Sequence, residues 1–258
     1  MNNAIFNFAE PANEPVLEYL PGSRERQLLE KELTEQGSRV VEIPLIIGGK
    51  EIKTGKTINV VNPADHNHVL AVCHMATEKE AAMAAEAALE AKAEWMNLAW
   101  MERASIMAKA AELISKKYRY KLNAATMLGQ GKNAFQAEID AACEVIDYLR
   151  FNNYFASMIY IEQPKSQDET INRLEYRPIE GFIYTITPFN FTAIASNLNA
   201  SVILMGNTTV WKPATTAVLS NYYLMKIFEE AGMPAGVVNF LPGPGSLISS
   251  VVMKHRDL

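Results

Sequence analysis

Three short segments carry the residues of this sequence that could bind a ligand or act on one. Residues 188–191 follow the β-rich stretch GFIYTIT, residues 212–215 follow NTTVW, and residues 242–245 follow GVVNF. In a parallel α/β sheet, ligands bind outside the carboxyl ends of the strands, so these positions are the candidates. Each segment also precedes a helix-length stretch whose N-terminal amides could face an anion. The arrangement suits the phosphates of a dinucleotide.

Asn190 is the residue whose side chain could act on a carbonyl group. Its amide can donate a hydrogen bond to the oxyanion that forms when a nucleophile adds to a carbonyl, an effect of about 3 to 4 kcal/mol. The alternative is an asparagine that caps the following helix, and the spacing alone favours this second interpretation.

Lys212 and the glycines of the third segment are weaker signals. A lysine at a strand end is usually a solvated charge, and only its position at a binding edge favours a functional role. Gly243 and Gly245 do not match G-x-G-x-x-G, because Ser246 and Leu247 follow without a third glycine. The GPG sequence is equally typical of a turn that closes a βα unit.

The two cysteines and four histidines suggest neither a disulfide nor a metal site. Cys73 and Cys143 are expected to be small buried hydrophobic residues. The histidines lack the spacing of metal ligands, and His66 and His68 are expected in a polar turn, NPADHNHV. No metal is expected.

Apolar spacing predicts helices over residues 23–35, 77–95 and 100–118, and from the GQGKN turn to about residue 158. The second begins with a T-x-x-E capping box at Thr77 and Glu80. Three basic residues suit the C-terminal end of the third, where they would complement the helix dipole: Lys116, Lys117 and Arg119.

The remaining pattern predicts strands. Residues 40–47 and the stretch TINVVNP, separated by a GGK turn, suggest a small strand pair. A protruding hairpin is expected over 162–180, where Ile171, Leu174 and Tyr176 alternate with polar residues. After residue 180, strands alternate with helices, which predicts a parallel sheet.

Bulk composition excludes several classes of partner. The chain of 258 residues has a formal charge of -5 and no basic stripe, so nucleic acid is not expected. The longest apolar stretches fall well short of the ~20 residues that a membrane span needs. The first residues lack the pattern of a secretory or transit peptide, so a cytoplasmic location is expected.

Two longer stretches, TPFNFTAIASNLNASVILMGNTTVWKPAT and AGMPAGVVNFLPGPG, resemble the aldehyde dehydrogenases. GQGKNAFQAEIDAACEVIDYLRFN and LEYRPIEGFIYTITPFNFTAIA further resemble the glutamate-semialdehyde (1-pyrroline-5-carboxylate) dehydrogenases of proline breakdown. The resemblance extends over nearly the whole chain. The related glutamyl-phosphate reductases are a rival family, but PFNF and QAEID argue against them.

The resemblance implies roles for particular residues. Asn190 would be the oxyanion donor, Phe191 would pack beside the carbon chain of the substrate, and Glu138 would line the substrate tunnel. Without the resemblance, Glu138 would be interpreted as a solvated helix carboxylate. Lys212 would contact the adenosine ribose of NAD. The other residues implied along the cofactor cleft are Thr187, Pro188, Phe189, Pro213, Ala214, Thr215, Gly243 and Gly245.

Thr215 occupies a position where many NAD-preferring relatives carry a glutamate, whose charge would repel a 2′-phosphate. A threonine at this position leaves NADP possible, although the resemblance to the glutamate-semialdehyde dehydrogenases implies NAD as the cofactor.

The implied fold is α/β and aldehyde-dehydrogenase-like, with an N-terminal helical layer and the first βα units of a Rossmann-like parallel sheet. Residues 1–40 would form an N-terminal arm and 41–160 the helical part of the cofactor-binding domain. Residues 161–180 would form a protruding oligomerisation hairpin, and 181–258 the Rossmann-like NAD-binding βα units. The catalytic domain is expected to be absent.

The implied reaction is the NAD-dependent oxidation of L-glutamate 5-semialdehyde to L-glutamate by a longer parent protein. The family supplies its nucleophilic cysteine and general-base glutamate from later segments, and neither Cys73 nor Cys143 has the position of that nucleophile. This chain alone is therefore expected to be truncated and inactive. Its expected partners are a small aldehyde and further copies of itself, joined through the hairpin. The alternative is a non-catalytic dinucleotide-binding or dimerising fragment.

Overall fold

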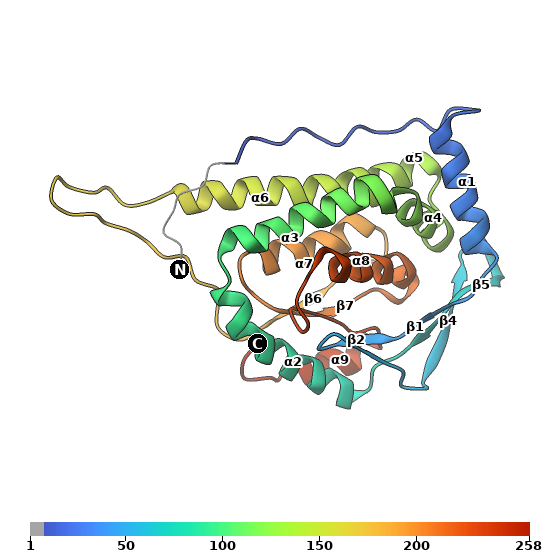
Figure 1. The fold of residues 1–258 in the computed structure, drawn as a ribbon. Coiled ribbons are helices and arrows are strands. Elements are labelled where there is room, and N and C mark those ends of the chain that lie inside the picture. Colours follow the sequence, from blue (N-terminus) through green and yellow to red (C-terminus); the bar gives the residue numbers. More distant parts are fainter. Residues whose placement is uncertain (1–7) are drawn as a thin grey trace.

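A five-stranded sheet forms the centre of the molecule in a computed structural model that describes residues 8–258 (Figure 1). Its strand order is β3-β2-β8-β7-β6. β6 (Ile183–Ile186), β7 (Thr209–Lys212) and β8 (Val238–Phe240) are parallel to one another. The predicted parallel arrangement after residue 180 is confirmed, and the α/β fold with it. The first seven residues of the expected arm lie outside the described residues.

Helices follow each of the three parallel strands and cover both faces of the sheet. α7 (Thr192–Leu204) follows β6, α8 (Val218–Ala231) follows β7 after a short 3₁₀ turn at Thr215–Ala217, and α9 (Gly245–Val252) follows β8. α7 and α8 lie on the face that α3 (Trp100–Leu113) covers, whereas α9 packs against α2 (Glu78–Asn97) on the opposite face (Figure 1). The N-terminal ends of these helices therefore meet at one edge of the sheet.

The apolar run at residues 40–47 belongs to two different sheets, because Pro44 interrupts it. β1 (Val41–Ile43) pairs with β5 (Asp65–His74), whereas β2 (Leu45–Ile47) pairs with β3 (Lys50–Ile52) and β8. Proline has no N–H to continue a ladder of hydrogen bonds. The predicted pairing of this run with TINVVNP was wrong, since β4 (Thr57–Asn62) pairs with β5 in the second sheet.

The polar turn expected around His66 and His68 is shorter than predicted. Only Pro63 and Ala64 form the turn, and both histidines lie on β5, where the His68 ring bonds the Gly37 carbonyl oxygen at 2.7 Å. Among residues 8–258, no three histidine, cysteine, aspartate or glutamate side chains are grouped closely enough to hold a metal ion.

Four of the expected helices are present, but one of them extends further than predicted. α1 (Arg24–Gly37) begins at its cap Ser23, and α2 (Glu78–Asn97) begins with the predicted capping box. α3 (Trp100–Leu113) does not end near residue 118; it continues through a π-helical turn (Ile114–Tyr118) into α4 (Arg119–Gln130). Arg119 therefore lies inside the helical layer and is buried, not at a solvated helix end.

The helix after the GQGKN turn also contains a π-helical segment. α5 (Ala134–Ala137) leads into the π-helix η2 (Glu138–Glu144) and then into α6 (Val145–Ile161). A π-helical segment widens the helix by one residue per turn and is frequent at functional sites. Here it turns the side chains of Glu138 and Asp140 into the interior.

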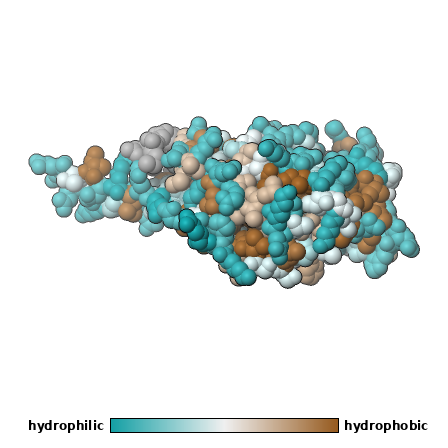
Figure 2. Space-filling model, turned by 90° about the horizontal axis from the view of Figure 1, so that it is seen from below, coloured by the Kyte–Doolittle hydropathy of each residue, from teal (hydrophilic) through white to brown (hydrophobic). Residues whose placement is uncertain are grey.

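Residues 162–180 protrude from the end of α6, as predicted (Figure 1). The two extended arms are joined by a bridge between Gln167 and Thr170. Apolar side chains on them are exposed, Ile171 at 80%, and hydrophobic atoms occur along this protrusion in the space-filling view (Figure 2). None of the helices within residues 8–258 is long and apolar enough to cross a membrane.

Candidate cofactor and oxyanion site

The carboxyl ends of β6, β7 and β8 bring the three predicted ligand-binding segments to one edge of the sheet. The Thr187 amide donates to the Lys212 carbonyl oxygen at 3.2 Å, and the Leu241 amide donates to the Trp211 carbonyl oxygen at 2.8 Å. These bonds fix the ends of neighbouring strands side by side. The residues that follow them lie at the amino ends of α7, α8 and α9.

Lys212 is a half-buried cation at this edge without a carboxylate partner among the described residues. Burial lowers the pKa of its ammonium group below the ordinary value for lysine. A partly desolvated ammonium is stabilised by an oxygen acceptor, and none among residues 8–258 bonds this one. Lys212 therefore suits a contact to a hydroxyl or phosphate oxygen of a ligand.

Gly243 and Gly245 serve different purposes. A Cβ atom at Gly243 would lie 2.8 Å from Ile248 Cδ1 and 3.2 Å from the Ala76 side chain, so this glycine permits close packing of α9. A Cβ atom at Gly245 would meet only the end of the Lys212 side chain, at 3.8 Å from Cε. Gly245 is exposed at the start of α9, so its backbone is open to a ligand beside the lysine.

The other predicted cleft residues differ in exposure. Thr187 faces the interior, where its hydroxyl accepts a hydrogen bond from Trp211 Nε1 at 3.0 Å, and Pro213 is buried as well. Phe189 is 67% exposed. The remaining three are partly exposed: Pro188, Ala214 and Thr215. The interior positions shape the strand ends, and the exposed ones are accessible to a ligand.

Asn190 is exposed, and its amide has no hydrogen-bond partner within the part of the chain that the structure describes. It does not cap α7, so the alternative interpretation of Asn190 as a helix cap was wrong. The cap comes from another element: Asp140 of η2 accepts from the Thr192 amide at 3.0 Å and from the Ala193 amide at 2.9 Å. The Asn190 side chain is left available at the edge of the sheet.

Phe191 follows Asn190 in the chain, and the Lys132 ammonium lies over its ring. The Lys132 ammonium is 4.2 Å from the centre of the Phe191 ring and also bonds the Asp140 carboxylate at 2.6 Å. Phe191 keeps 36% of its surface exposed, so one part of the ring is held while another faces outward. Such a ring can pack beside the apolar part of a small ligand.

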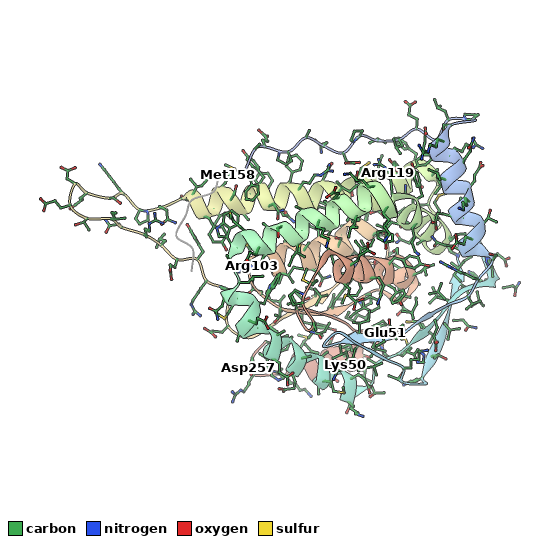
Figure 3. The ribbon with its side chains drawn as sticks, in the orientation of Figure 1. Lys50, Glu51, Arg103, Arg119, Met158 and Asp257 are labelled. Carbon is green, nitrogen blue, oxygen red and sulfur yellow. The ribbon has the colours of Figure 1, made fainter. Side chains whose placement is uncertain are left out.

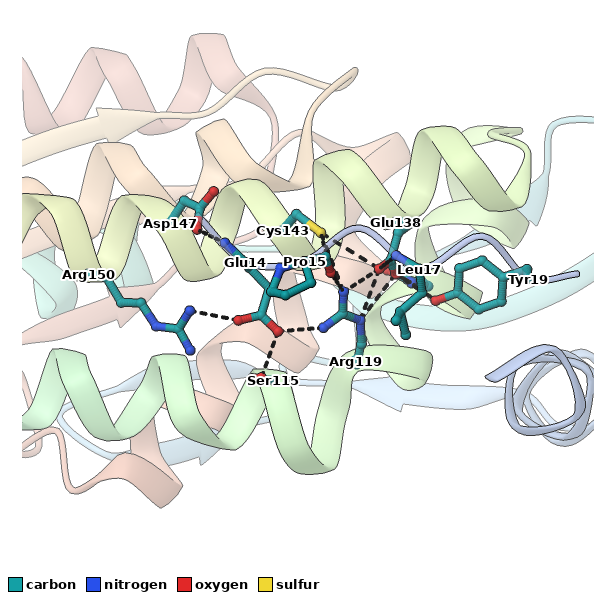
Figure 4. Close-up of polar contacts among 11 residues, drawn as sticks. Glu14, Pro15, Leu17, Tyr19, Ser115, Arg119, Glu138, Cys143, Asp147 and Arg150 are labelled. Carbon is teal, nitrogen blue, oxygen red and sulfur yellow. Dashed lines mark hydrogen bonds and ion pairs between the residues drawn. The ribbon is translucent and has the colours of Figure 1, made fainter. Parts of the chain in front are cut away.

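Glu138 lies elsewhere, in the interior beneath the N-terminal arm (Figure 4). Its side chain is fully buried, so it is not the solvated carboxylate considered above. It accepts hydrogen bonds from Arg119 Nε at 3.0 Å and from the Tyr19 hydroxyl at 2.6 Å. It also accepts from the Asn123 amide and the Leu17 backbone amide. These residues and Glu14 form the arm cluster, which encloses the Glu138 carboxylate. Glu138 therefore does not lie with Asn190 at the edge of the sheet. The members of the arm cluster are Glu14, Leu17, Tyr19, Arg119, Asn123 and Glu138.

Arg119 connects the two carboxylates of the arm cluster, and Figure 3 shows it between the long helices and the arm. Its guanidinium group bonds Glu14 Oε1 at 2.6 Å as well as Glu138. Burial alone would raise the pKa of Glu138, but hydrogen bonds from Arg119, Tyr19 and Leu17 hold that pKa below its ordinary value. Glu138 is thus an ionised anchor for the arm.

Both cysteines are buried, as predicted. Burial raises the pKa of the Cys73 thiol to about 12. Burial, followed by the nearby Glu138 carboxylate, raises that of Cys143 to about 12. Since the thiolate is the nucleophilic form, neither group is activated for attack on a carbonyl.

Three charged residues of the helical layer were missed from the sequence: Asp140, Lys132 and Glu144. Asp140 and Lys132 hold the Asn190–Phe191 turn, and Glu144 is a partly buried carboxylate one helical turn beyond Asp140. Burial, followed by repulsion from Asp140, raises the pKa of Glu144. The only signal in the sequence was the spacing of acidic residues in EIDAACEVID, which is equally typical of a solvated helix face.

A model of the aldehyde dehydrogenase family matches residues 51–258. A probable delta-1-pyrroline-5-carboxylate dehydrogenase of Schizosaccharomyces pombe is 49% identical over 256 residues, covering 98% of this chain and 47% of the relative. A mitochondrial delta-1-pyrroline-5-carboxylate dehydrogenase of Dictyostelium discoideum is 46% identical over 97% of this chain and 45% of its own length.

Solved structures agree with the sequence relatives. The crystal structure of the delta-pyrroline-5-carboxylate dehydrogenase from Mycobacterium tuberculosis bound with NAD superposes with a TM-score of 0.97 at 45% identity. The superposition covers 100% of this chain and 48% of the chain of that dehydrogenase.

The parallel sheet, with polar residues exposed at its carboxyl edge, is the α/β arrangement in which ligands bind beyond the strand ends. The chain belongs to the aldehyde dehydrogenase family. Its relatives are named as dehydrogenases of 1-pyrroline-5-carboxylate, and the chain spans about half of their length.

Proposed function

We propose that this chain is the cofactor-binding and oxyanion-binding part of a dehydrogenase that oxidises L-glutamate 5-semialdehyde to L-glutamate with NAD, in proline catabolism. The observation that carries the proposal is that the Asn190 amide and the Lys212 ammonium, both without a hydrogen-bond partner among residues 8–258, follow or end two neighbouring parallel strands. The names of the relatives and the NAD bound in a close structural neighbour support the choice of substrate and cofactor.

Asn190 and Phe191 are assigned to the aldehyde substrate, and Lys212 and Gly245 to NAD. Asn190 donates its amide to the oxygen of the aldehyde as that oxygen gains negative charge, and Phe191 packs beside the carbon chain of the substrate. Lys212 contacts a ribose hydroxyl, and the exposed backbone at Gly245 lies beside the cofactor. NAD, when bound, supplies the acceptor for a hydride. Because Glu138 is enclosed, we assign the substrate contact to Phe191 and not to Glu138.

The nucleophile of the reaction is proposed to lie outside these 258 residues. The high pKa and the burial of Cys73 and Cys143 support this assignment, since a buried neutral thiol attacks a carbonyl poorly. The 258-residue chain by itself would then bind NAD without oxidising an aldehyde. Finding aldehyde oxidation by the purified chain would contradict this part of the proposal.

Calorimetric titration of the purified chain with NAD tests the cofactor site. K212Q removes the ammonium group at the strand end and is expected to weaken NAD binding by about tenfold, as loss of one charge-assisted hydrogen bond would. K254Q is the matched control, because Lys254 is exposed near the end of α9. Equal affinities for all three proteins would exclude Lys212 from the cofactor site.

The activity itself is tested with the protein expressed from its complete coding sequence. Formation of reduced nicotinamide is followed with 1-pyrroline-5-carboxylate, which is in equilibrium with the open-chain semialdehyde, and with propanal as a small aldehyde lacking the carboxylate. A strong preference for the first supports the substrate assignment. Activity with neither aldehyde would sink the proposed function. A cytoplasmic location belongs to the proposal; since relatives are named as mitochondrial, cell fractionation is its test.

A second function, as a non-catalytic dimerising module, is favoured by the exposed hairpin. Ile171 is 80% and Leu174 54% exposed on a protruding segment, and an apolar surface of this kind suits burial against another chain. Replacing both with aspartate is expected to convert an oligomer to monomer in light scattering. Replacing the exposed, polar Gln167 and Asp168 with serine on the same protrusion is the control. A wild-type protein that is monomeric at all concentrations would overturn this assignment.

A further inference from the structure

Asp140 supplies the hydrogen bonds that the amino end of α7 would otherwise lack. The cap position of α7 is Phe191, whose side chain cannot accept a hydrogen bond. Asp140 accepts from the Thr192 amide with Oδ2 and from the Ala193 amide with Oδ1, at 3.0 and 2.9 Å. These donors lie 52 and 53 residues further along the chain, and Asp140 itself is only 2% exposed. The carboxylate is therefore placed by the π-helical segment η2 against a separate helix.

Lys132 extends the same contact to Phe191. Its ammonium group bonds Asp140 Oδ2 at 2.6 Å and lies 4.2 Å from the centre of the Phe191 ring. A cation over an aromatic face is attracted to the ring electrons. Asp140 thus holds the helix amides that follow Asn190. Lys132 holds the aromatic ring of the neighbouring Phe191.

The contact also determines what the Asn190 amide can do. Asparagine readily bonds nearby backbone N–H groups when they are free, and Asn190 precedes Thr192 by two residues. The amides of Thr192 and Ala193 already donate to Asp140. The Asn190 side-chain oxygen therefore has no free backbone amide nearby from which to accept a hydrogen bond. The side chain remains exposed at the edge of the sheet, without a hydrogen-bond partner among residues 8–258.

We propose that Asp140 and Lys132 are positioning residues, which fix the Asn190–Phe191 turn so that the Asn190 amide faces the aldehyde oxygen and the Phe191 ring faces the carbon chain. The proposal rests on the proposed dehydrogenase function. In this proposal neither residue contacts the substrate or NAD, since the side chains of Asp140 and Lys132 are only 3% and 17% exposed. Asp140 acts through the α7 amides on Asn190, and Lys132 acts mainly on Phe191.

A second anchor keeps α7 in place when Asp140 is changed. The Thr192 hydroxyl lies 2.9 Å from the Thr126 hydroxyl and accepts from the Gln130 amide at 2.8 Å, and it bonds the Ser220 hydroxyl at 3.0 Å. Loss of the Asp140 carboxylate is therefore expected to loosen the turn before α7 without releasing the helix.

Steady-state kinetics of the protein expressed from its complete coding sequence provide the first test. D140N keeps the shape of the side chain and one oxygen acceptor, but turns an N–H donor toward the second helix amide or the Lys132 ammonium. It is expected to lower kcat by about 10- to 100-fold, as small misplacements of a reacting group do, while NAD affinity changes less than about twofold. D147N is the matched control, because Asp147 bonds Asn13 and the Glu14 amide of the arm.

Substitutions of Lys132 test the positioning of Phe191 separately from the positioning of Asn190. K132M keeps an apolar stem near the ring but removes the cation, so KM for the aldehyde is expected to rise several-fold with a smaller effect on kcat. K132R restores a cation that can reach both Asp140 and the ring, and is expected to recover the wild-type KM. A purely structural role would not produce this split between KM and kcat, nor its recovery.

Amide hydrogen exchange provides a test that does not depend on catalysis. In D140N the Thr192 and Ala193 amides are expected to exchange faster than in wild type and D147N, while the interior of α7 stays protected. If wild type oxidises no aldehyde, the proposed function fails, whereas the exchange result still decides whether Asp140 holds the turn. Wild-type kcat in D140N, or unchanged exchange at both amides, would overturn the positioning role. Should D140N not fold, the split between KM and kcat in K132M and its recovery in K132R still decide.

Discussion

Two polar regions of the molecule differ in how completely their groups are paired. In the arm cluster, Glu138 and Arg119 are buried and each bonds several partners, including residues of the N-terminal arm more than a hundred positions away. At the strand edge, Asn190 and Lys212 lie at the surface or half-buried without such partners. The first region uses its charges to hold the chain together, and the second has hydrogen-bonding capacity left for a ligand.

Removing Arg119 should produce the largest loss of stability. R119M leaves the buried carboxylates of Glu138 and Glu14 without their shared cation, and breaking a buried ion pair from one side costs about 3–5 kcal/mol. Urea unfolding of the chain, followed by circular dichroism, measures the loss. R150M is the control, since Arg150 is partly exposed and bonds only Glu14 of the cluster, at 2.6 Å. Equal destabilisation by both changes would contradict the central role of Arg119.

Asn190 should behave in the opposite way. N190A removes no hydrogen bond within the described chain, so its effect on the free energy of unfolding is expected to stay within about 0.5 kcal/mol. In the protein expressed from its complete coding sequence, the same change should lower kcat by about 100- to 1000-fold, as loss of an oxyanion donor does. Urea unfolding and aldehyde-dependent NAD reduction are measured on the same preparation. A stability loss comparable to that of R119M would show that Asn190 is structural.

The same contrast explains what the sequence could predict. Strand ends and the order of βα units follow from local patterns, and these patterns predicted that Lys212 and Asn190 lie at the same edge of the sheet, as they do. The capping box at Thr77 and Glu80 is likewise local, with a 2.9 Å bond across three residues. Candidate ligand-binding positions could be found in this way because the topology of a parallel sheet assembles strand ends without further information.

Contacts between distant residues could not be predicted in that way. Arg119 was expected at a solvated helix end, but a π-helical turn carries the helix onward and turns the guanidinium group inward. Asp140 received no role from the sequence, although it caps α7 from 52 residues away. Pro44 divides one apolar run between two sheets. Each of these arrangements depends on contacts with residues distant in the sequence, which the spacing of apolar residues does not specify.

Acid should weaken the arm cluster, because its central carboxylate is stabilising only while it is ionised. The pKa of Glu138 is lowered in the folded chain, because the bonds from Arg119, Tyr19 and Leu17 outweigh burial. Its ionised form therefore contributes stability above the ordinary glutamate pKa of about 4.3, and this contribution is lost as the pH falls from there through the lower folded value.

E138Q tests this pH dependence. It keeps the shape but not the charge, so unfolding at neutral pH should become easier by about 1–3 kcal/mol, and the decrease in stability with acid should become less steep. Urea unfolding from neutral pH down to about one unit below the ordinary glutamate pKa measures both effects. D147N is the control for a carboxylate that also bonds the arm but is not enclosed. A wild-type pH profile in E138Q would assign the acid sensitivity to other groups.

The smallest expected effect concerns Thr215, where a charge should change the choice of ligand without changing the fold. Thr215 begins the 3₁₀ turn before α8 and is partly exposed, so T215E should leave the free energy of unfolding within about 0.5 kcal/mol of wild type. If the adenosine ribose lies beside Lys212, the new carboxylate repels a 2′-phosphate by about 1 kcal/mol through partly screened charge. NADP binding should then weaken by roughly fivefold while NAD binding is retained, as calorimetric titration with each cofactor would show, and T215Q controls for side-chain size. Equal weakening of NAD and NADP by T215E and T215Q would mean that residue 215 limits access to the edge by its bulk and does not select by charge.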